Sequence, residues 1–243
     1  MQNKSSLDSN RTDFNAQIAK TVVGLVPFAG GVLAELVDSI IPRQRMDRVA
    51  KFCKELDDRI LKIENKDIHE LFKNEAFVDL IEESFVQASR ATTDERRGYI
   101  VSIVVNGITD ETVNYQDSKY LLRLLSELND LEVIWLRFYL EPLHDRDTEF
   151  RQLHKNVLTP VSSYKGADKE TINKASIQKS YKEHLERLQL IKGNIRFDKK
   201  ANLPEYDRTT GLPKATFHQL TTLGEMLLEH IGLLNEKDKG NIT

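Results

Sequence analysis

The sequence predicts a mainly α-helical protein with one small β element near its C-terminal end. Helix-breaking residues are sparse, with 11 glycines and 6 prolines among 243 residues. Apolar residues recur mostly three and four positions apart, which is the stripe of an amphipathic helix. Short apolar runs flank turn-forming residues only at Ile195–Phe197 and Phe217–Leu220, so we expect these segments to pair as antiparallel strands.

The N-terminal region predicts an apolar helical hairpin after a polar tail at residues 1–12. One helix carries its stripe from Phe14 to Leu25 and stops before Pro27, and a second runs from Val32 to Ile41. The uncharged stretch Thr21–Ala34, which joins the two helices, is shorter than the roughly 18 residues of a membrane span and contains Pro27, which excludes a transmembrane anchor. We expect core packing, with self-association or bilayer insertion as alternatives. The candidate residues of this hairpin are Val26, Pro27, Phe28, Leu33, Leu36 and Val37.

Further helices are expected between residues 43 and 128. They cover about Arg43–Glu64, Phe77–Ala88, a segment from Thr92 to about Gly107, and Ser118–Leu128. Thr92 and Glu95 have the spacing of a capping box at the start of the third of these. Cys53 falls in an apolar stripe with no basic cluster around it, so it predicts a buried small residue and not a reactive thiol.

The C-terminal half predicts one buried helix and one long polar helix. Asn129 and Glu132 form a capping-box pattern before Val133–Leu140, which is apolar almost all round and predicts the centre of a C-terminal core. A short helix is expected around Phe150–Leu158. The segment from Asp168 to Leu190 reads either as one continuous helix or as a helix-turn-helix. A turn at Gly193–Asn194 is expected to follow it.

The end of the chain predicts a capped closing helix. Thr221 or Thr222 can cap it, Glu225 can complete a capping box with Thr222, and Gly224 permits close packing.

The order of these elements from about Lys119 to Leu233 resembles a winged-helix domain. The run Leu185-Glu-Arg-Leu-Gln-Leu-Ile before a basic-glycine turn resembles a recognition helix entering its wing. The run Gln219-Leu-Thr-Thr-Leu-Gly resembles the return strand and last helix. The resemblance implies a winged-helix-like domain with a two-stranded wing at 116–234. We expect an N-terminal helical bundle at 13–115 before it and a tail at 235–243 after it.

Such a domain implies either DNA binding or docking of a protein. Between Lys174 and Lys200 the sequence has eight basic and three acidic residues, although Glu183 and Glu186 would repel phosphates. An ordinary solvated helix face with a basic wing explains the same pattern, and both readings stay open. The candidate nucleic-acid or partner-binding residues are Gln178, Lys179, Tyr181, Lys182, Arg187, Lys192, Arg196, Lys199 and Lys200.

The sequence favours a non-enzymatic protein without a metal or cofactor. It contains no phosphate-binding glycine loop, no dinucleotide fingerprint, and no zinc-protease or nucleophile-elbow motif. The acidic run at His144–Glu149 with His154 lacks a coordination spacing, and His69, His184, His218 and His230 are expected to stand alone. One cysteine and a polar N-terminus predict a cytoplasmic protein, and a net charge of -3 excludes global attraction to nucleic acid.

The helical N-terminal half with Gly24-Leu-Val-Pro-Phe-Ala-Gly-Gly31, joined to a winged-helix-like half, resembles bacterial proteins of the abortive-infection type grouped as Abi-alpha. This resemblance implies phage defence. The first hypothesis is therefore an interaction protein whose C-terminal domain docks a protein or nucleic-acid partner. The second is a DNA-binding regulator, and the third a membrane-perturbing effector acting through the hairpin.

The hairpin prediction can be tested with Leu36→Ala. If the hairpin packs in the core, the substitution should lower the free energy of unfolding by about 2 to 5 kcal/mol, as a cavity in a packed interior does. Chemical denaturation measures this. An unchanged stability together with lost self-association or vesicle leakage would instead make the hairpin an exposed interaction surface.

Overall fold

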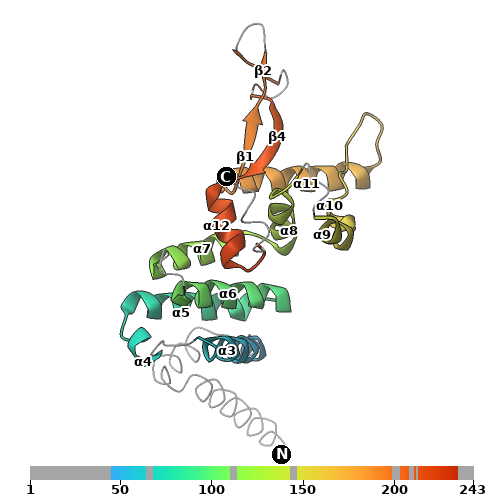
Figure 1. Ribbon diagram of the computed structural model, residues 1–243. Helices are drawn as coiled ribbons and strands as arrows, with labels where there is room; N and C mark the ends of the chain where they lie inside the picture. The colour runs from blue at the N-terminus through green and yellow to red at the C-terminus, as the bar shows by residue number, and fades with distance from the viewer. Residues whose placement is uncertain are drawn as a thin grey trace, which may run out of the picture. The chain divides into compact units, whose positions relative to one another are not determined.

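A computed structural model describes residues 45–63, 68–109, 114–142, 147–198, 203–207, 211 and 213–234 (Figure 1). These residues confirm a mainly helical fold with a small two-stranded sheet near the C-terminus. The apolar hairpin of the sequence analysis, Lys199 and Lys200 lie outside them. The chain divides into two compact units: Met1–Ser126 with His230–Gly232, and Glu127–Glu229 with Leu233–Thr243.

The first unit is helical throughout its described residues. Its helices are α3 (Met46–Ile60), α4 (Ile68–Leu71), α5 (Glu75–Arg90), α6 (Asp94–Thr109) and α7 (Tyr115–Glu127). α3, α5 and α6 pack against one another along their apolar stripes. Phe52 and Phe85 meet edge to face inside this core, with ring centroids 5.5 Å apart.

Cys53 is buried in the core, as its place in the apolar stripe predicts. Burial raises the pKa of the Cys53 thiol to about 12, because the thiolate would lose its hydration. The thiol therefore stays protonated and acts as a small apolar group.

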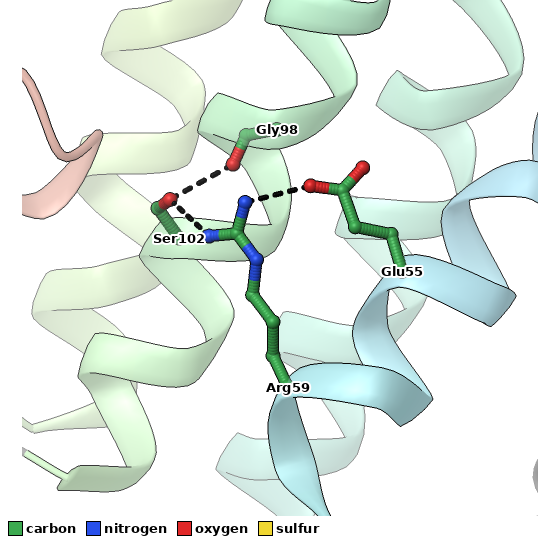
Figure 2. A network of polar contacts seen from close by, with 4 residues as sticks. All are labelled: Glu55, Arg59, Gly98 and Ser102. Atoms are coloured by element: carbon green, nitrogen blue, oxygen red, sulfur yellow. Dashed lines mark hydrogen bonds and ion pairs between the residues drawn. The ribbon is translucent and has the colours of Figure 1, made fainter. Parts of the chain in front are cut away.

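A polar network joins α3 to α6 at the rim of this core (Figure 2). Arg59 Nη1 donates to Ser102 Oγ at 2.7 Å, and Arg59 Nη2 donates to Glu55 Oε1 at 2.6 Å. Ser102 Oγ in turn donates to the Gly98 carbonyl oxygen at 2.9 Å. The guanidinium is partly exposed, so the network fixes the orientation of the two helices more than it adds stability.

The start of α6 differs by one residue from the sequence prediction. Thr93 Oγ1 accepts a hydrogen bond from the Arg96 N–H at 3.2 Å, so Thr93 and not Thr92 caps the helix. Ala91 ends α5 in an extended conformation with ψ 123°, which leaves Thr92 in the connection. By contrast, the capping box of Asn129 and Glu132 is confirmed, with both reciprocal hydrogen bonds present.

The second unit builds a small core around α8. Its elements are α8 (Asp130–Phe138), α9 (Thr148–Leu153), α10 (Lys155–Leu158), α11 (Lys169–Arg187), β1 (Ile191–Ile195), β2 (Phe197–Asp198), β3 (Leu203–Pro204), β4 (Ala215–Leu220) and α12 (Thr222–His230). α8 buries Val133 and Leu136, as its apolar pattern predicts, but also Glu132 and Arg137. Arg137 Nη1 pairs with Asp147 Oδ2 at 2.8 Å, which compensates its buried charge.

The strand pairing corrects the sequence prediction. β1 pairs with β4 in antiparallel register, with Ile191 opposite Leu220, and a second antiparallel pair joins β2 to β3 (Figure 1). The antiparallel pair with Phe217–Leu220 is confirmed, but its partner strand is Ile191–Ile195 and not Ile195–Phe197. The predicted turn at Gly193–Asn194 is wrong, because both residues lie within β1. Gln189 makes the reversal instead, with φ 58° in the left-handed region, and the strand begins two residues later at Ile191.

Gly193 lies within β1 because the neighbouring strand approaches closely there. A Cβ atom at this position would lie 2.9 Å from the Ala215 Cβ and 3.3 Å from His218 Nε2. The glycine therefore serves strand packing and not a turn.

Thr221 is the residue that caps α12. Its Oγ1 accepts from the Gly224 N–H at 3.1 Å and donates to the Gln189 carbonyl oxygen at 2.6 Å. The capping box between Thr222 and Glu225 is wrong, because Thr222 already lies inside the helix and the Glu225 N–H bonds to the Thr221 carbonyl. The close packing predicted for Gly224 is confirmed, since a Cβ atom there would overlap the Leu190 carbonyl oxygen.

Two of the helical glycines, Gly98 and Gly224, predict opposite effects of alanine. Gly224→Ala should lower the free energy of unfolding, because its Cβ meets backbone that cannot yield cheaply. Gly98→Ala in α6 should raise it by about 0.5 to 1 kcal/mol, since a Cβ there would stay 3.5 Å from the nearest atom, Glu55 Oε1. Urea denaturation of both variants measures the pair. Equal effects would contradict the packing at Leu190.

Candidate partner-binding surface

α11 is a long helix that the protein leaves largely in solvent. It runs unbroken from Lys169 to Arg187, so the continuous alternative of the sequence analysis is the one observed, and only Leu185 in it is fully buried. The Asp168 side chain caps its start by accepting from the Thr171 N–H at 2.8 Å and the Thr171 hydroxyl at 2.9 Å. These bonds favour the carboxylate and lower the pKa of Asp168.

Several predicted contact residues on α11 already have partners within the chain. Lys179 Nζ pairs with Glu183 Oε1 at 3.6 Å, and Lys174 Nζ with Glu170 Oε1 at 2.6 Å. Gln178 anchors the segment before α11, since its Oε1 accepts from the Val161 N–H at 2.9 Å. Its Nε2 also donates to the Thr159 carbonyl at 2.9 Å, so the amide has a structural role.

Lys182 and Arg187 are the predicted contact residues of α11 that keep their positive charge available. Among the described residues, neither has an ion pair. Arg187 is exposed at the end of the helix, and Lys182 and Tyr181 are half-buried. The predicted set therefore does not act as one uniform basic face.

Two histidine–glutamate pairs fasten α11 to its neighbours. His184 Nδ1 lies 2.7 Å from Glu132 Oε1 on α8, and His218 Nε2 on β4 lies 2.9 Å from Glu186 Oε1. The expectation that His184 and His218 stand alone is wrong. The sequence separation of 52 residues between His184 and Glu132 explains why no local motif revealed the pair.

Glu132 serves two elements at once. One carboxylate oxygen contacts His184, and the other accepts from the Asn129 N–H at 2.9 Å within the capping box of α8. This buried side chain therefore couples the start of α8 to the last turns of α11.

His218 sits in a crowded electrostatic setting. Glu186 and Lys182 of α11 lie near it. The centroid of the Tyr139 ring, one residue beyond α8, lies 6.1 Å from the centroid of the His218 ring. Burial and the nearby Lys182 charge lower the pKa of His218, and Glu186 only partly offsets them. Burial, with the Glu186 charge, raises the pKa of Tyr139 to about 12.

Beyond β1 and β4 the chain continues into a second, smaller strand pair, and its base is closed by backbone hydrogen bonds. The Arg196 N–H donates to the Lys214 carbonyl at 2.8 Å, the Lys214 N–H to the Glu205 carbonyl at 2.7 Å, and the Glu205 N–H to the Arg196 carbonyl at 2.8 Å. Arg196 Nε also pairs with Glu205 Oε1 at 3.2 Å. The predicted contact residue Arg196 is therefore part of this closure.

The sequence analysis missed an apolar surface on this part of the chain. Large apolar side chains with substantial exposure occur along the two strand pairs, and we name them together the hairpin apolar surface: Ile195, Phe197, Leu203, Tyr206 and Phe217. Their exposed fractions run from 38% at Phe217 to 62% at Leu203. Phe197 pairs with Pro204 and Leu203 with Asp198, so Phe197 and Leu203 lie on opposite faces of the second pair. The sequence could have indicated this surface, because its apolar residues are spaced through a segment that also contains Pro204, Gly211 and Pro213. Such a segment cannot bury them in a regular core.

Lys192 is the remaining predicted contact residue among those that the structure describes. Lys192 is exposed on β1, and its positive charge lowers the pKa of Glu225, although burial raises that pKa overall.

Within the described ranges, no group of three or more histidine, cysteine, aspartate or glutamate side chains could hold a metal ion. No described helix is long and apolar enough to cross a bilayer.

Comparison with known proteins gave no match: no family model fits the chain, and no curated protein or solved structure is significantly similar to it.

The environment of His218 predicts a pH dependence of stability. Its pKa in the folded state lies below the unfolded value of 6.5, so the unfolded chain binds the proton more readily. Its contribution to stability should therefore be complete above about pH 6.5 and fall as the pH drops towards the folded pKa. Denaturation curves across this range should show a smaller acid loss for His218→Gln than for the wild type.

Lys182→Gln provides the matched test of the cause. Removing this charge should raise the pKa of His218, which proton NMR of the imidazole can follow. An unchanged titration would exclude Lys182 as a cause.

Proposed function

We propose that the second unit is a non-enzymatic docking module of winged-helix type, which binds a macromolecular partner at the hairpin apolar surface. The order α11, β1, β4 and α12 supports this proposal, because a helix leads into a β-hairpin that returns to a closing helix. The observation that carries it is the concentration of exposed apolar side chains on the strands and the connection between them.

These exposed side chains have an energetic cost that a partner would remove. Burying a large apolar side chain contributes about 1.5 to 3 kcal/mol, so leaving several in water forgoes much of that gain. Single exposed apolar residues are ordinary, whereas a group of them marks an interaction site. Of the twelve large apolar side chains exposed in the described residues, five belong to this one segment, which favours a site there over chance exposure.

Duplex DNA is the second candidate partner. Lys182 and Arg187 favour it, since no ion pair in the described residues neutralises them. The pairing of Lys174, Lys179 and Arg196 with carboxylates argues against it, because these cations must break a contact to reach a phosphate. Protein docking is therefore ranked first.

The wider biological setting stays a prediction from the sequence. The resemblance to abortive-infection proteins suggests a role in phage defence in the cytoplasm of a bacterium. Membrane perturbation would depend on the N-terminal hairpin, which lies outside the described residues.

The docking function can be tested by comparing what the chain captures in its own cells. The variant Phe197→Ser with Leu203→Ser should lose partners that the wild type retains in quantitative affinity capture, with its melting temperature nearly unchanged, because both side chains are already exposed. Tyr164→Ser is the control, since Tyr164 is 69% exposed but lies outside the hairpin. If the double variant and the control capture the same proteins, the proposal is wrong.

The DNA alternative makes a separate prediction. If duplex DNA binds through α11, Lys182→Ala and Arg187→Ala should each reduce the slope of log affinity against log salt by about one unit. Lys179→Ala should change it less, because Glu183 already neutralises that lysine. A mobility-shift titration with salt measures all three. Absence of any binding by the wild type removes this alternative.

A further inference from the structure

We propose that β1 and β2, which follow each other through residues 191–198, pair along their outer edge with the same edge of a second copy of this chain. The two strands run antiparallel to each other. This inference rests on the docking function proposed above and names its partner. It follows from the direction of the backbone groups along the edge and from the order of the charges on it.

The backbone groups of this strand alternate in direction, and three hydrogen bonds fix the alternation. The Leu190 carbonyl oxygen accepts from the Thr221 N–H at 3.0 Å. The Arg196 N–H donates to the Lys214 carbonyl oxygen at 2.8 Å, and the Arg196 carbonyl oxygen accepts from the Glu205 N–H at 2.8 Å. In an antiparallel ladder every second residue directs both backbone groups at the neighbouring strand. The even-numbered residues from 190 to 198 therefore direct theirs at β4 and β3.

Gly193, Ile195 and Phe197 direct their N–H and C=O groups to the other side, away from β4 and β3. Within the described part of the chain, no hydrogen bond reaches the backbone groups of these three residues. β4 has no such regular row, because the register shift between Gly193 and Ile195 leaves one extra residue in it as a bulge. The strands also extend away from α11 and α12 (Figure 1). A row of unpaired backbone groups on an edge is a template for a further strand.

The side chains of the same strand alternate between two faces. Ile195 and Phe197 lie on one face, where they are 47% and 52% exposed. The other face carries four polar residues: Lys192, Asn194, Arg196 and Asp198. A second copy of this strand has the same alternation, so it continues both the apolar and the polar face across the edge.

One register brings the two copies together with opposite charges. Outward backbone groups meet only when odd-numbered residues oppose odd-numbered residues. With Ile195 opposite itself, Lys192 lies opposite Asp198 of the second copy, and the twofold symmetry repeats this pair. With Asn194 opposite itself, Lys192 would lie opposite Arg196, and like charges directly opposite are unfavourable. The order of charges therefore selects the register centred on Ile195.

The other charges near this edge do not cancel that attraction. Burial raises the pKa of Glu225, and the nearby Lys192 only partly offsets it. No described carboxylate lies at ion-pair distance from Lys192. Arg196 is already paired with Glu205. Asp198 has an interaction within its own chain, and a carboxylate can accept several hydrogen bonds.

Pairing of the edges would also strengthen the hairpin itself. In the selected register Gly193 lies opposite Phe197 of the second copy, and an aromatic side chain opposite an edge glycine stabilises a sheet. Two strands alone are marginally stable, and three or more are needed for a sheet that supports itself. The two hairpins would form one continuous sheet in a closed, symmetric dimer.

Charge exchange between Lys192 and Asp198 tests the register. In Lys192→Asp alone and in Asp198→Lys alone, like charges oppose each other twice, so the dissociation constant of the dimer should rise about tenfold or more. An equimolar mixture of the two variants restores both opposite-charge pairs and should form the dimer again. Sedimentation velocity across a dilution series measures all of these. Lys214→Asp is the charge-matched control, because Lys214 is exposed but lies off this edge, and it should dimerise like the wild type.

Ile195→Pro tests the backbone pairing. Proline removes an outward N–H that the β1–β4 ladder does not use, and an edge strand tolerates proline at such a position. The variant should lose the dimer while its melting temperature stays close to that of the wild type. Ile195→Val keeps the N–H and should still dimerise. If the proline variant fails to fold, the mixture of the two charge variants decides the question by itself.

Two results would overturn the inference. One is a wild type that stays monomeric at its highest soluble concentration. The other is a dimer that both single charge variants form as tightly as the wild type. Neither result removes the docking function, which fails separately if Phe197→Ser with Leu203→Ser captures the same proteins as the Tyr164→Ser control.

Discussion

The carbonyl oxygen of Leu190 is where α11, the β-hairpin and α12 are held together. It accepts the Thr221 N–H at 3.0 Å, and the Thr221 hydroxyl, whose shorter hydrogen bond goes to the Gln189 carbonyl, lies 3.1 Å from it. Gly224 lies against the same oxygen, where any side chain would overlap. Gln189 reaches this arrangement through a left-handed backbone conformation that costs a non-glycine residue free energy. The buried neighbours Leu185, Ile191, Leu220 and Leu227 offset that cost, so the hairpin leaves the helices in one direction.

The side chains of the β-hairpin are of two kinds. Some hold the strands to α11 and to each other, and others are exposed to solvent. His218 and Glu186 bind β4 to α11, and the three backbone bonds among Arg196, Glu205 and Lys214 close the base of the distal strands. Beyond this base no described element covers Phe197 or Leu203. Contacts that already order the base of the strands lower the entropic cost of binding a partner there.

Local sequence patterns predicted the features that depend on residues close together in the sequence. The stripe containing Phe52 and Cys53, the capping box of Asn129 and Glu132, and the close packing at Gly224 follow from spacing or residue type alone. The strand register was misplaced because the reversal uses Gln189, which carries none of the turn preference of glycine or asparagine. The histidine–glutamate pairs, the ion-paired lysines and the exposed hairpin side chains depend on tertiary contacts that no local pattern contains.

The central claim is that the hairpin apolar surface is open in the free protein. Thiol labelling under native conditions measures this directly, because the one native cysteine, Cys53, is buried with its pKa raised to about 12 and should not react. Leu203→Cys should react with iodoacetamide at a rate close to that of an unstructured peptide cysteine, while Cys53 stays unmodified. Protection of Cys at position 203 to the level of Cys53 would show that the surface is already covered, and would contradict the account.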